Sequence, residues 1–323
     1  MRDAAPKATW ADPPRRRAAA AAAGRRRRAR APLVDLHSHT RASDGSDTPD
    51  ELVAAAARAG IGVLAVTDHD TLAAAEAARA LGRRLGVEVL TGCELTTEAE
   101  GEVVHLLAYG DGLAAASVGA RYAAVRDGRE ARNRAIGRRL RVLTGVGYED
   151  AAALAGGAAL SRAHFARVLI ARGVARDVAD AFERWLGPGR PAYVAAPGLP
   201  LAEAVAMVHA AGGVAVVAHP GRLPAITRDR VLAACVEAGA DGLEAWHPQH
   251  DRDERRRWAG QAERNGLLVT GGSDYHGSHK PGIALGTGAG DLAVPVDAVA
   301  ELRARLSAPP APAASPRRTV TSG

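Results

Sequence analysis

Four short polar clusters, each placed directly after an apolar run typical of a β-strand, constrain this chain more than any other feature. Parallel barrels and doubly wound sheets carry their chemistry at the ends of strands. One His-x-His pair alone would be weak evidence, because alternate residues of any strand share a face. Four such clusters instead predict one multi-metal site, and they are Asp35-Leu-His37-Ser-His39, Thr67-Asp68-His69, Ala218-His219-Pro220 and Ser273-Asp274-Tyr-His276.

Three further residues fit such a site but are ambiguous when taken singly. Asp44, in Ser43-Asp44-Gly45, is typical of a turn. Glu94 follows the apolar stretch 87–91 and could be a carboxylate at the rim of a barrel without any ligand. His105 interrupts an otherwise apolar strand, where an imidazole needs a polar partner. Because these coincidences add to the four clusters, we interpret all three residues as candidate metal ligands.

Helix and strand patterns alternate along most of the chain and predict an α/β fold. A capping box, Thr48-Pro49-Asp-Glu51, opens a helix that continues to about Ala59, where Gly60 ends it. A second helix is predicted from Thr71 to about Leu85. The remaining predictions are strands at 63–66, 87–91, 103–109, 214–218, 241–245 and 267–271, and helices at 201–211, 228–238 and 251–265. Residues 112–186 have helical spacing throughout, so we predict a (β/α) barrel that is split by a helical insertion.

The net charge of +6 is unevenly distributed. Residues 1–31 carry +8, and Arg317 and Arg318 in the C-terminal tail add +2, which leaves −4 for residues 32–307. Within that part, residues 112–190 hold fourteen arginines and seven acids, so the barrel itself carries −11. An acidic body that could hold cations is therefore joined to a basic insertion that could hold phosphate.

Composition favours a single globular enzyme with tails at both ends. Arginine runs at the N-terminus and an Ala/Pro/Ser-rich stretch from Ser307 onward predict disorder in both tails. No apolar run is long enough to span a membrane. Two cysteines, Cys93 and Cys235, are too few for a disulfide framework, so we expect a cytoplasmic protein and interpret Cys93 as a small buried thiol. The predicted parts are 1–31 (disordered basic tail), 32–111 and 191–306 (barrel), 112–190 (insertion covering the substrate) and 307–323 (disordered tail).

The clusters, in this order, resemble the polymerase and histidinol phosphatase (PHP) superfamily over about residues 33–290. The resemblance is closer to the bacterial branch that acts on nucleoside 3′,5′-bisphosphates and on the 5′ ends of short RNA. It rests on Ser161-Arg162-Ala-His164-Phe-Ala, Gly189-Arg-Pro-Ala-Tyr193-Val, Ala218-His-Pro-Gly-Arg222 and Gly272-Ser-Asp-Tyr-His276. It implies a distorted, seven-stranded (β/α)7 PHP barrel. It also implies nine metal ligands, which fall on His37, His39, Asp44, His69, Glu94, His105, His219, Asp274 and His276.

The resemblance implies three divalent metals and a division of these ligands among them. His37, His39, Glu94 and Asp274 would surround one metal, Glu94 would bridge to a second held by His105 and His219, and a third would lie between Asp44, His69 and His276. Mixed imidazole and carboxylate donors suit manganese, iron or zinc better than magnesium, and manganese is our first expectation. A hydroxide shared by two such metals would attack phosphorus in line. Asp68 is expected to orient a ligand or a water from outside the coordination sphere.

The insertion is expected to hold the substrate. Ser161, Arg162 and His164 place a hydroxyl, a guanidinium and an imidazole at a predicted helix start, where amides and the helix dipole favour an anion. The residues alone fit an N-cap serine with two solvated neighbours equally well, and the resemblance is what favours phosphate binding. Arg222 and Lys280 are further candidate phosphate contacts. His209 is expected to be structural, while His247, His250 and His279 carry no assigned role.

Three functions from different classes are compatible with these observations. The first is a metal-dependent phosphoesterase that converts nucleoside 3′,5′-bisphosphates to 5′-monophosphates or removes 5′-terminal nucleotides from short 5′-phosphorylated RNA or DNA. The second is a histidinol-phosphate phosphatase. The third is a nucleic-acid-binding protein with structural metals. The Ser-Arg-x-His motif favours the first over the second, and the complete ligand set and low aromatic content (3%) disfavour the third. We expect a nucleotide or short oligonucleotide as partner and infer no protein partner.

Overall fold

The computed structural model describes residues 32–156, 160–195 and 198–308 of the chain. Of the two predicted disordered tails, 1–31 and 307–323, residues 1–31 and 309–323 lie outside the described residues. A C-terminal helix that the sequence pattern did not predict, α10 (Asp297–Ser307), ends on the first residue of the predicted C-terminal tail. None of the described helices is long and apolar enough to cross a membrane.

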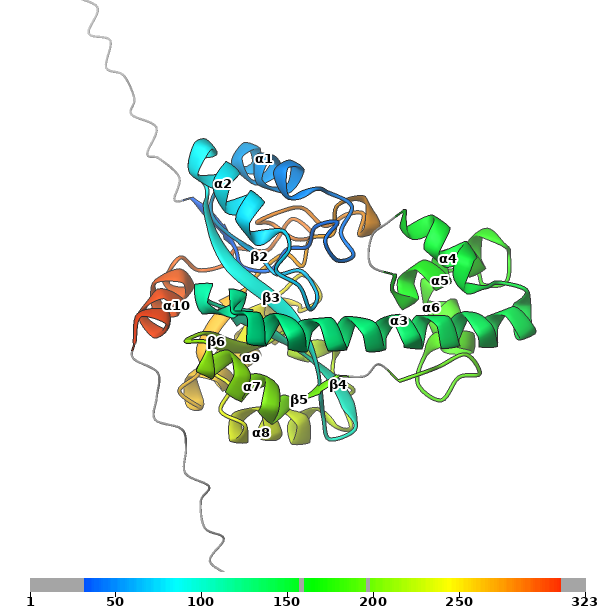
Figure 1. Ribbon diagram of the computed structural model, residues 1–323. Coiled ribbons are helices and arrows are strands. Elements are labelled where there is room, and N and C mark those ends of the chain that lie inside the picture. Colours follow the sequence, from blue (N-terminus) through cyan, green and yellow to red (C-terminus); the bar gives the residue numbers. More distant parts are fainter. Residues whose placement is uncertain (1–31, 157–159, 196–197, 309–323) are drawn as a thin grey trace, which may run out of the picture. The chain divides into compact units, whose positions relative to one another are not determined.

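A sheet forms the centre of the fold (Figure 1). Its seven main strands have the order β1, β2, β3, β4, β6, β7 and β8. The strands are β1 (Leu33–Asp35), β2 (Ile61–Val66), β3 (Glu88–Ala99), β4 (Glu102–Tyr109), β6 (Val214–Val217), β7 (Gly242–Trp246) and β8 (Leu268–Gly271), and the short β5 (Leu199–Pro200) pairs with β3. The first and last strands meet beyond their ends. Ser38 forms a parallel bridge with Tyr275, and the Leu36 amide donates to the Gly271 carbonyl at 3.2 Å. The sheet therefore returns on itself, as the predicted barrel requires.

The barrel departs from regular β/α alternation at β3 and β4. These two strands form an antiparallel hairpin, and β4 is also antiparallel to β6. Glu100 (φ +53°) and Gly101 (φ +77°) make the turn between them. Because Thr96 is paired with His105, Glu94 and His105 are diagonal neighbours on one face. The sequence predicted both strands but not their antiparallel pairing, and this distortion is what brings the two residues together.

Of the first two predicted helix starts, the structure confirms one and contradicts the other. Helix α1 (Pro49–Ala59) begins with the predicted capping box: Thr48 Oγ1 accepts from the Glu51 amide, and a Glu51 carboxylate oxygen accepts from the Thr48 amide at 2.8 Å. Helix α2 begins at Ala75 and ends at Leu85, so its predicted start at Thr71 was wrong. Thr71 Oγ1 instead accepts from the Ala73 amide at 3.2 Å, a local turn that competes with helix formation.

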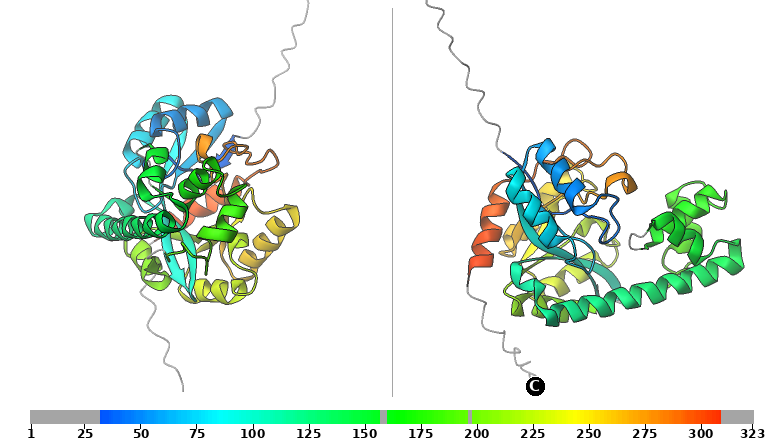
Figure 2. Two further views of the ribbon diagram at one scale, coloured as in Figure 1. Left: turned by 90° about the vertical axis from the view of Figure 1, so that its right-hand side faces the viewer. Right: turned by 45° about the horizontal axis from the view of Figure 1, so that its top comes forward.

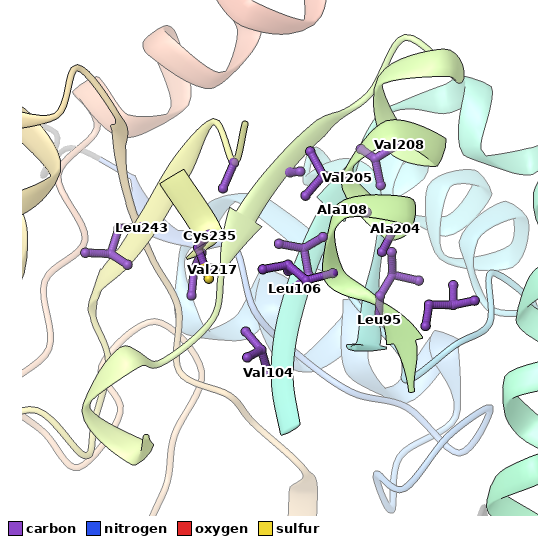
Figure 3. Packing of buried hydrophobic residues seen from close by; sticks show 14 of the residues in the cluster. Leu95, Val104, Leu106, Ala108, Ala204, Val205, Val208, Val217, Cys235 and Leu243 are labelled. Carbon is purple, nitrogen blue, oxygen red and sulfur yellow. The ribbon is translucent and has the colours of Figure 1, made fainter. Parts of the chain in front are cut away.

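The largest apolar core lies between the sheet and the helices of its second half. Side chains from β3, β4, β6 and β7 pack against α7 (Leu201–Ala210) and α8 (Arg228–Glu237), and α9 (Arg252–Arg264) adds the buried Trp258. Figure 3 shows part of this cluster, in which Leu95, Leu106, Val205, Val217 and Cys235 come from five different elements. Helices α1 and α2 pack together over the first strands (Figure 2). The barrel core thus holds the strand ends at fixed spacing.

The helical insertion has an apolar core of its own. Helix α3 (Ala116–Thr144) contributes Val118 and Tyr122 to the barrel cluster, but Ile136 and Leu140 to a second cluster. That second cluster also contains side chains of α4 (Tyr148–Ala155), α5 (Arg162–Ala171), α6 (Val178–Ala181) and the following helical turn (Phe182–Leu186), which gather along the C-terminal half of α3 (Figure 2). One long helix therefore connects the barrel to the insertion.

Candidate metal centre

The nine candidate ligands come from six places in the barrel and converge on one site. They follow the C-terminal ends of β1, β2, β6 and β8, or lie on the β3–β4 hairpin, with Asp44 in the loop after His39. Three sets of donor atoms are mutually within 4.8 Å. These sets are His37, His39 and Glu94; His69, Glu94 and His105; and His39, Asp44, His69 and His276.

Glu94 is the centre of this arrangement, because its carboxylate lies between five imidazole rings. The distances from Oε2 are 3.3 Å to His37 Nε2, 3.2 Å to His39 Nε2 and 3.3 Å to His69 Nδ1, and those from Oε1 are 2.8 Å to His105 Nδ1 and 3.0 Å to His219 Nε2. The side chain is buried and can reach two neighbouring donor groups at once. The bridging role that the resemblance implied for Glu94 stays a prediction.

Asp44 and His276 lie on the side of the site away from His219. Asp44 Oδ1 is 3.2 Å from His276 Nε2 and 3.5 Å from His39 Nδ1, while Oδ2 is 3.8 Å from His69 Nε2. Asp274 Oδ1 is within 3.7 Å of the nearest ring nitrogens of His37, His39 and His276. His39 and His69 therefore each border two donor groups, which the predicted three-way division did not include.

This donor set fits divalent metal ions. Two ligand atoms that are each about 2.0–2.2 Å from one ion lie about 3.0–3.5 Å apart. His37 Nε2 and His39 Nε2 are separated by 3.1 Å, and both face the Glu94 carboxylate. Among the described residues, the buried His69 Nδ1 makes no aligned hydrogen bond. Cations held between the neighbouring donor sets would satisfy these nitrogens.

Charge within the site keeps the acids ionised in spite of burial. Burial raises the pKa of Glu94, but His69 and His105 outweigh it and hold the pKa well below the usual range. Burial likewise opposes ionisation of Asp44 and Asp274, and the facing cationic groups again bring both pKa values well below normal. Burial lowers the pKa of His219 to about 3, so this ring is neutral, as a metal ligand must be.

Backbone strain is concentrated around the same site. Of the four non-glycine residues with positive φ in the described part of the chain, His219 (φ +27°) and Asp274 (φ +50°) are candidate ligands, and Asp70 (φ +51°) follows His69. Each such conformation costs on the order of 1–3 kcal/mol and persists only where its surroundings impose it. At His219 and Asp274, this cost in stability accompanies the backbone conformation that directs the side chain into the site.

Asp68 supports the loop that carries Asp44. One carboxylate oxygen accepts from the Thr40 amide at 2.8 Å and from Ser43 Oγ at 2.6 Å, and the other accepts from Thr40 Oγ1 at 2.7 Å. Ser43 Oγ in turn lies 3.4 Å from His39 Nδ1. These contacts fit the predicted orienting role of Asp68, which acts through two hydroxyl groups.

A cavity of about 480 Å³ opens over the candidate ligands. Asp44, His69, Glu94, His105, Asp274 and His276 line it from the barrel. The insertion supplies the opposite wall, and both together surround the cavity with cationic side chains: Arg129, Arg132, Arg162, Arg167, Arg222 and Lys280. Arg129, Arg132 and Arg167 were not among the predicted site residues, because an arginine on a helix most often faces water and its sequence context does not distinguish a buried one.

The predicted substrate motif lies on this wall. Helix α5 begins at Arg162, directly after Ser161, as predicted. The Ser161 amide donates to His164 Nδ1 at 3.1 Å, which leaves the proton of a neutral ring on Nε2. Arg162 lies over the rings of Phe182 and Tyr193, and among the described residues no carboxylate pairs with it.

Arg132 is a second cation without a carboxylate partner in the described part of the chain. It is only 9% exposed, and its guanidinium donates to the neighbouring Asn133 side chain at 2.8 Å. Burial, and then repulsion from Arg162 and Arg129, lowers its pKa to about 9. A buried, unpaired guanidinium is costly unless an anion joins it. This wall is therefore suited to phosphate.

The other candidate residues have varied surroundings. Lys280 lines the cavity, but its ammonium is 2.5 Å from Asp274 Oδ2, a contact that the sequence did not predict. Arg222 is half exposed and 3.9 Å from the same oxygen. Outside the cavity, His209 pairs with Asp241 at 2.9 Å, which agrees with a structural role. Cys93 is buried, as predicted.

Known proteins are similar to this chain in both sequence and fold. The PHP domain family model matches residues 35–187. The chain is 38% identical over 261 residues to the 5′-3′ exoribonuclease Rnm of Salmonella typhimurium (79% of this chain, 89% of that protein). It is 36% identical over 258 residues to the 3′,5′-nucleoside bisphosphate phosphatase of Chromobacterium violaceum (78% and 90%). A crystal structure from Bifidobacterium adolescentis, assigned as a metal-dependent phosphoesterase, matches with a TM-score of 0.74 at 34% identity (85% and 97%).

The extent of these matches shows that the chain belongs to the PHP family. It is an enzyme of the metal-dependent, phosphoester-hydrolysing class, and the family, fold and class predicted from its sequence are confirmed.

Proposed function

We propose that the protein hydrolyses phosphate esters of nucleotides. Its substrates would be nucleoside 3′,5′-bisphosphates, which yield 5′-monophosphates, or short 5′-phosphorylated RNA or DNA cut from the 5′ end. The observation that carries this proposal is one cavity with two unlike walls. The barrel wall holds a buried cluster of imidazoles and carboxylates, and the insertion wall holds guanidinium groups that no carboxylate among the described residues pairs with. A molecule with two phosphates satisfies both walls, and the relatives named for such substrates support the same choice.

The nine candidate ligands would hold three divalent transition metals, with manganese first and iron or zinc as alternatives. His37, His39, Glu94 and Asp274 would form one group, Glu94, His105 and His219 a second, and Asp44, His69 and His276 a third. When bound, such metals polarise phosphoryl oxygens and make water a stronger nucleophile near neutral pH. The mixed nitrogen and oxygen donors favour these metals over magnesium.

The protein's own groups would orient the ester between the two walls. Glu94 and Asp274 stay ionised and set the positions of their neighbouring donors. On the opposite wall, Arg162 and the Nε2–H of His164 would donate to the phosphate that is not cleaved, with Ser161, Arg222 and Lys280 as further contacts. Charge-assisted hydrogen bonds of this kind fix orientation as well as affinity. No protein nucleophile is needed.

The cationic wall also argues against histidinol phosphate. That substrate carries an ammonium group beside its single phosphate, and Arg132 and Arg162 would repel it at short range. A nucleotide with two phosphates gains from the same charges. Because the cationic wall repels an ammonium group but attracts a second phosphate, we rank the nucleotide first.

One assay separates these alternatives. We expect manganese-loaded protein to release phosphate from adenosine 3′,5′-bisphosphate or to shorten a 5′-phosphorylated oligoribonucleotide, with little turnover of histidinol phosphate. Stripping the metal with a chelator should abolish turnover, and adding Mn²⁺ should restore it. Full activity in a preparation shown by elemental analysis to contain no metal would refute the proposal.

The N-terminal arginine runs are expected to be dispensable for chemistry. The candidate ligands and the cationic wall all come from residues 32–308. Deleting residues 1–31 should therefore leave kcat and KM for a mononucleotide unchanged. Binding of long RNA could weaken with a marked dependence on salt, since each lost phosphate contact reduces the salt slope by about one. A large loss of mononucleotide turnover would place the tail in the site.

A further inference from the structure

Strand β7 and the turn after it place three polar side chains beneath the candidate metal centre. Glu244, His247 and His250 are each 1% exposed or less. None of the three belongs to the nine candidate ligands. Together, however, they contact the three segments that follow β1, β6 and β8 and carry candidate ligands, so a single stretch of chain supports three strand ends at once.

Glu244 contacts two of these segments. Its Oε1 is 2.9 Å from His37 Nδ1, and its Oε2 accepts a hydrogen bond from the His219 amide at 2.8 Å. The first contact fixes the proton of His37 on Nδ1 and leaves Nε2 free to face Glu94. The second fixes the backbone of His219, whose φ of +27° is strained. One buried carboxylate thus orients a ligand from β1 and another from β6.

His247 and His250 complete the set. The Nε2–H of His247 can donate to Asp274 Oδ2 at 3.2 Å, while its Nδ1 accepts from the Gln249 amide. His250 accepts from the Gly221 amide through Nε2 at 3.0 Å and donates through Nδ1 to the Ala245 carbonyl at 2.9 Å. Both rings therefore have one defined tautomer. His250 holds the turn that follows His219, and His247 holds Asp274 after β8.

We propose that Glu244, His247 and His250 form a positioning triad that sets the metal affinity of the two donor groups sharing Glu94. This inference rests on the proposed function, because it assumes that the nine candidate ligands hold metals. Carboxylate partners of metal-binding histidines orient the ring and increase its basicity, and their loss typically lowers metal affinity about 10- to 100-fold. The triad makes no hydrogen bond or ion pair to Asp44, His69 or His276.

The decisive variant is Glu244→Gln, which keeps the size of the side chain but removes its charge. We expect the Mn²⁺ dissociation constant of two ions to rise about 10- to 100-fold. The ion between Asp44, His69 and His276 should bind as before. The measurement is bound Mn²⁺, by elemental analysis and electron paramagnetic resonance, after dialysis against graded chelator. The variant should then retain about one equivalent under conditions in which the wild type retains all.

The chain offers a matched control in Asp241→Asn. Asp241 also accepts from a histidine ring, His209 at 2.9 Å, and from a backbone amide, that of Ala215 at 2.8 Å, but neither partner is a candidate ligand. The Asp241→Asn variant should lose about as much thermal stability as Glu244→Gln, measured in a thermal melt, while its Mn²⁺ affinity stays unchanged. His247→Gln, whose amide can still donate to Asp274, provides a second test if Glu244→Gln fails to fold.

The outcomes separate the two proposals. If the wild type binds no transition metal, the proposed function fails. If the wild type binds Mn²⁺ and both Glu244→Gln and His247→Gln retain it as tightly, the function stands and the positioning triad is refuted. A loss of Mn²⁺ affinity that Asp241→Asn shares would show that the effect is general stability, and this result also overturns the inference.

Discussion

Replacement of Glu94 by glutamine is expected to lower kcat/KM for a nucleoside 3′,5′-bisphosphate by about 1,000-fold or more, which corresponds to about 4 kcal/mol. The Glu94 carboxylate faces five candidate ligands, through Oε2 to three imidazoles and through Oε1 to two. Glutamine keeps the shape but loses the charge that balances the cations. Bound metal should fall together with activity, and both are measured on the same preparation.

Glu98→Gln is the matched control for this prediction. Glu98 lies on the same strand β3, four residues further on, but it is exposed, and within the described part of the chain it accepts only from the Gly198 amide at 3.2 Å. It should keep wild-type metal content and turnover. Circular dichroism of both variants checks that the fold is retained. If Glu94→Gln loses activity while it binds all of its metal, Glu94 serves the substrate and our assignment of its role is wrong.

The strand ends of this fold could be predicted because each carries a local signal. An apolar run followed by His and Asp is visible in the sequence at His37, His69, His219 and Asp274, and the capping box before Glu51 is a local contact between residues three apart. Such signals depend on neighbours in the chain. The antiparallel pairing of β3 with β4 depends instead on long-range register, and the pattern of two adjacent strands did not reveal it.

Glu244 shows why part of the site could not be found in this way. It stands inside Gly242-Leu243-Glu244-Ala245-Trp246, where a charge in a buried strand is itself a signal that a partner exists. The partner, however, is His37, which lies 207 residues away, so only the fold identifies it. Arg132 gives still less warning, because its burial depends on how α3 packs against the insertion.

Arg162→Ala is expected to cut kcat/KM for a nucleoside 3′,5′-bisphosphate by about 30- to 1,000-fold. That range corresponds to about 2–4 kcal/mol, the cost of leaving a desolvated charge without its partner. The Arg162 guanidinium lines the cavity, lies over two aromatic rings and pairs with no carboxylate among the described residues. An aryl phosphate lacks the second phosphate, so its hydrolysis should fall much less. Steady-state kinetics on both substrates gives the comparison.

Arg172→Ala separates loss of a phosphate contact from loss of the insertion's stability. Arg172 ends the same helix α5 that Arg162 begins, but it is exposed, pairs with Asp150 at 3.1 Å and lies outside the cavity. It should leave both substrates unaffected. Arg162→Lys should recover only part of the bisphosphate activity, because an ammonium cannot make the two parallel hydrogen bonds of a guanidinium. An equal loss on both substrates in Arg162→Ala would mean that Arg162 supports the metal centre or the fold, since a contact to the second phosphate cannot affect a substrate that lacks it.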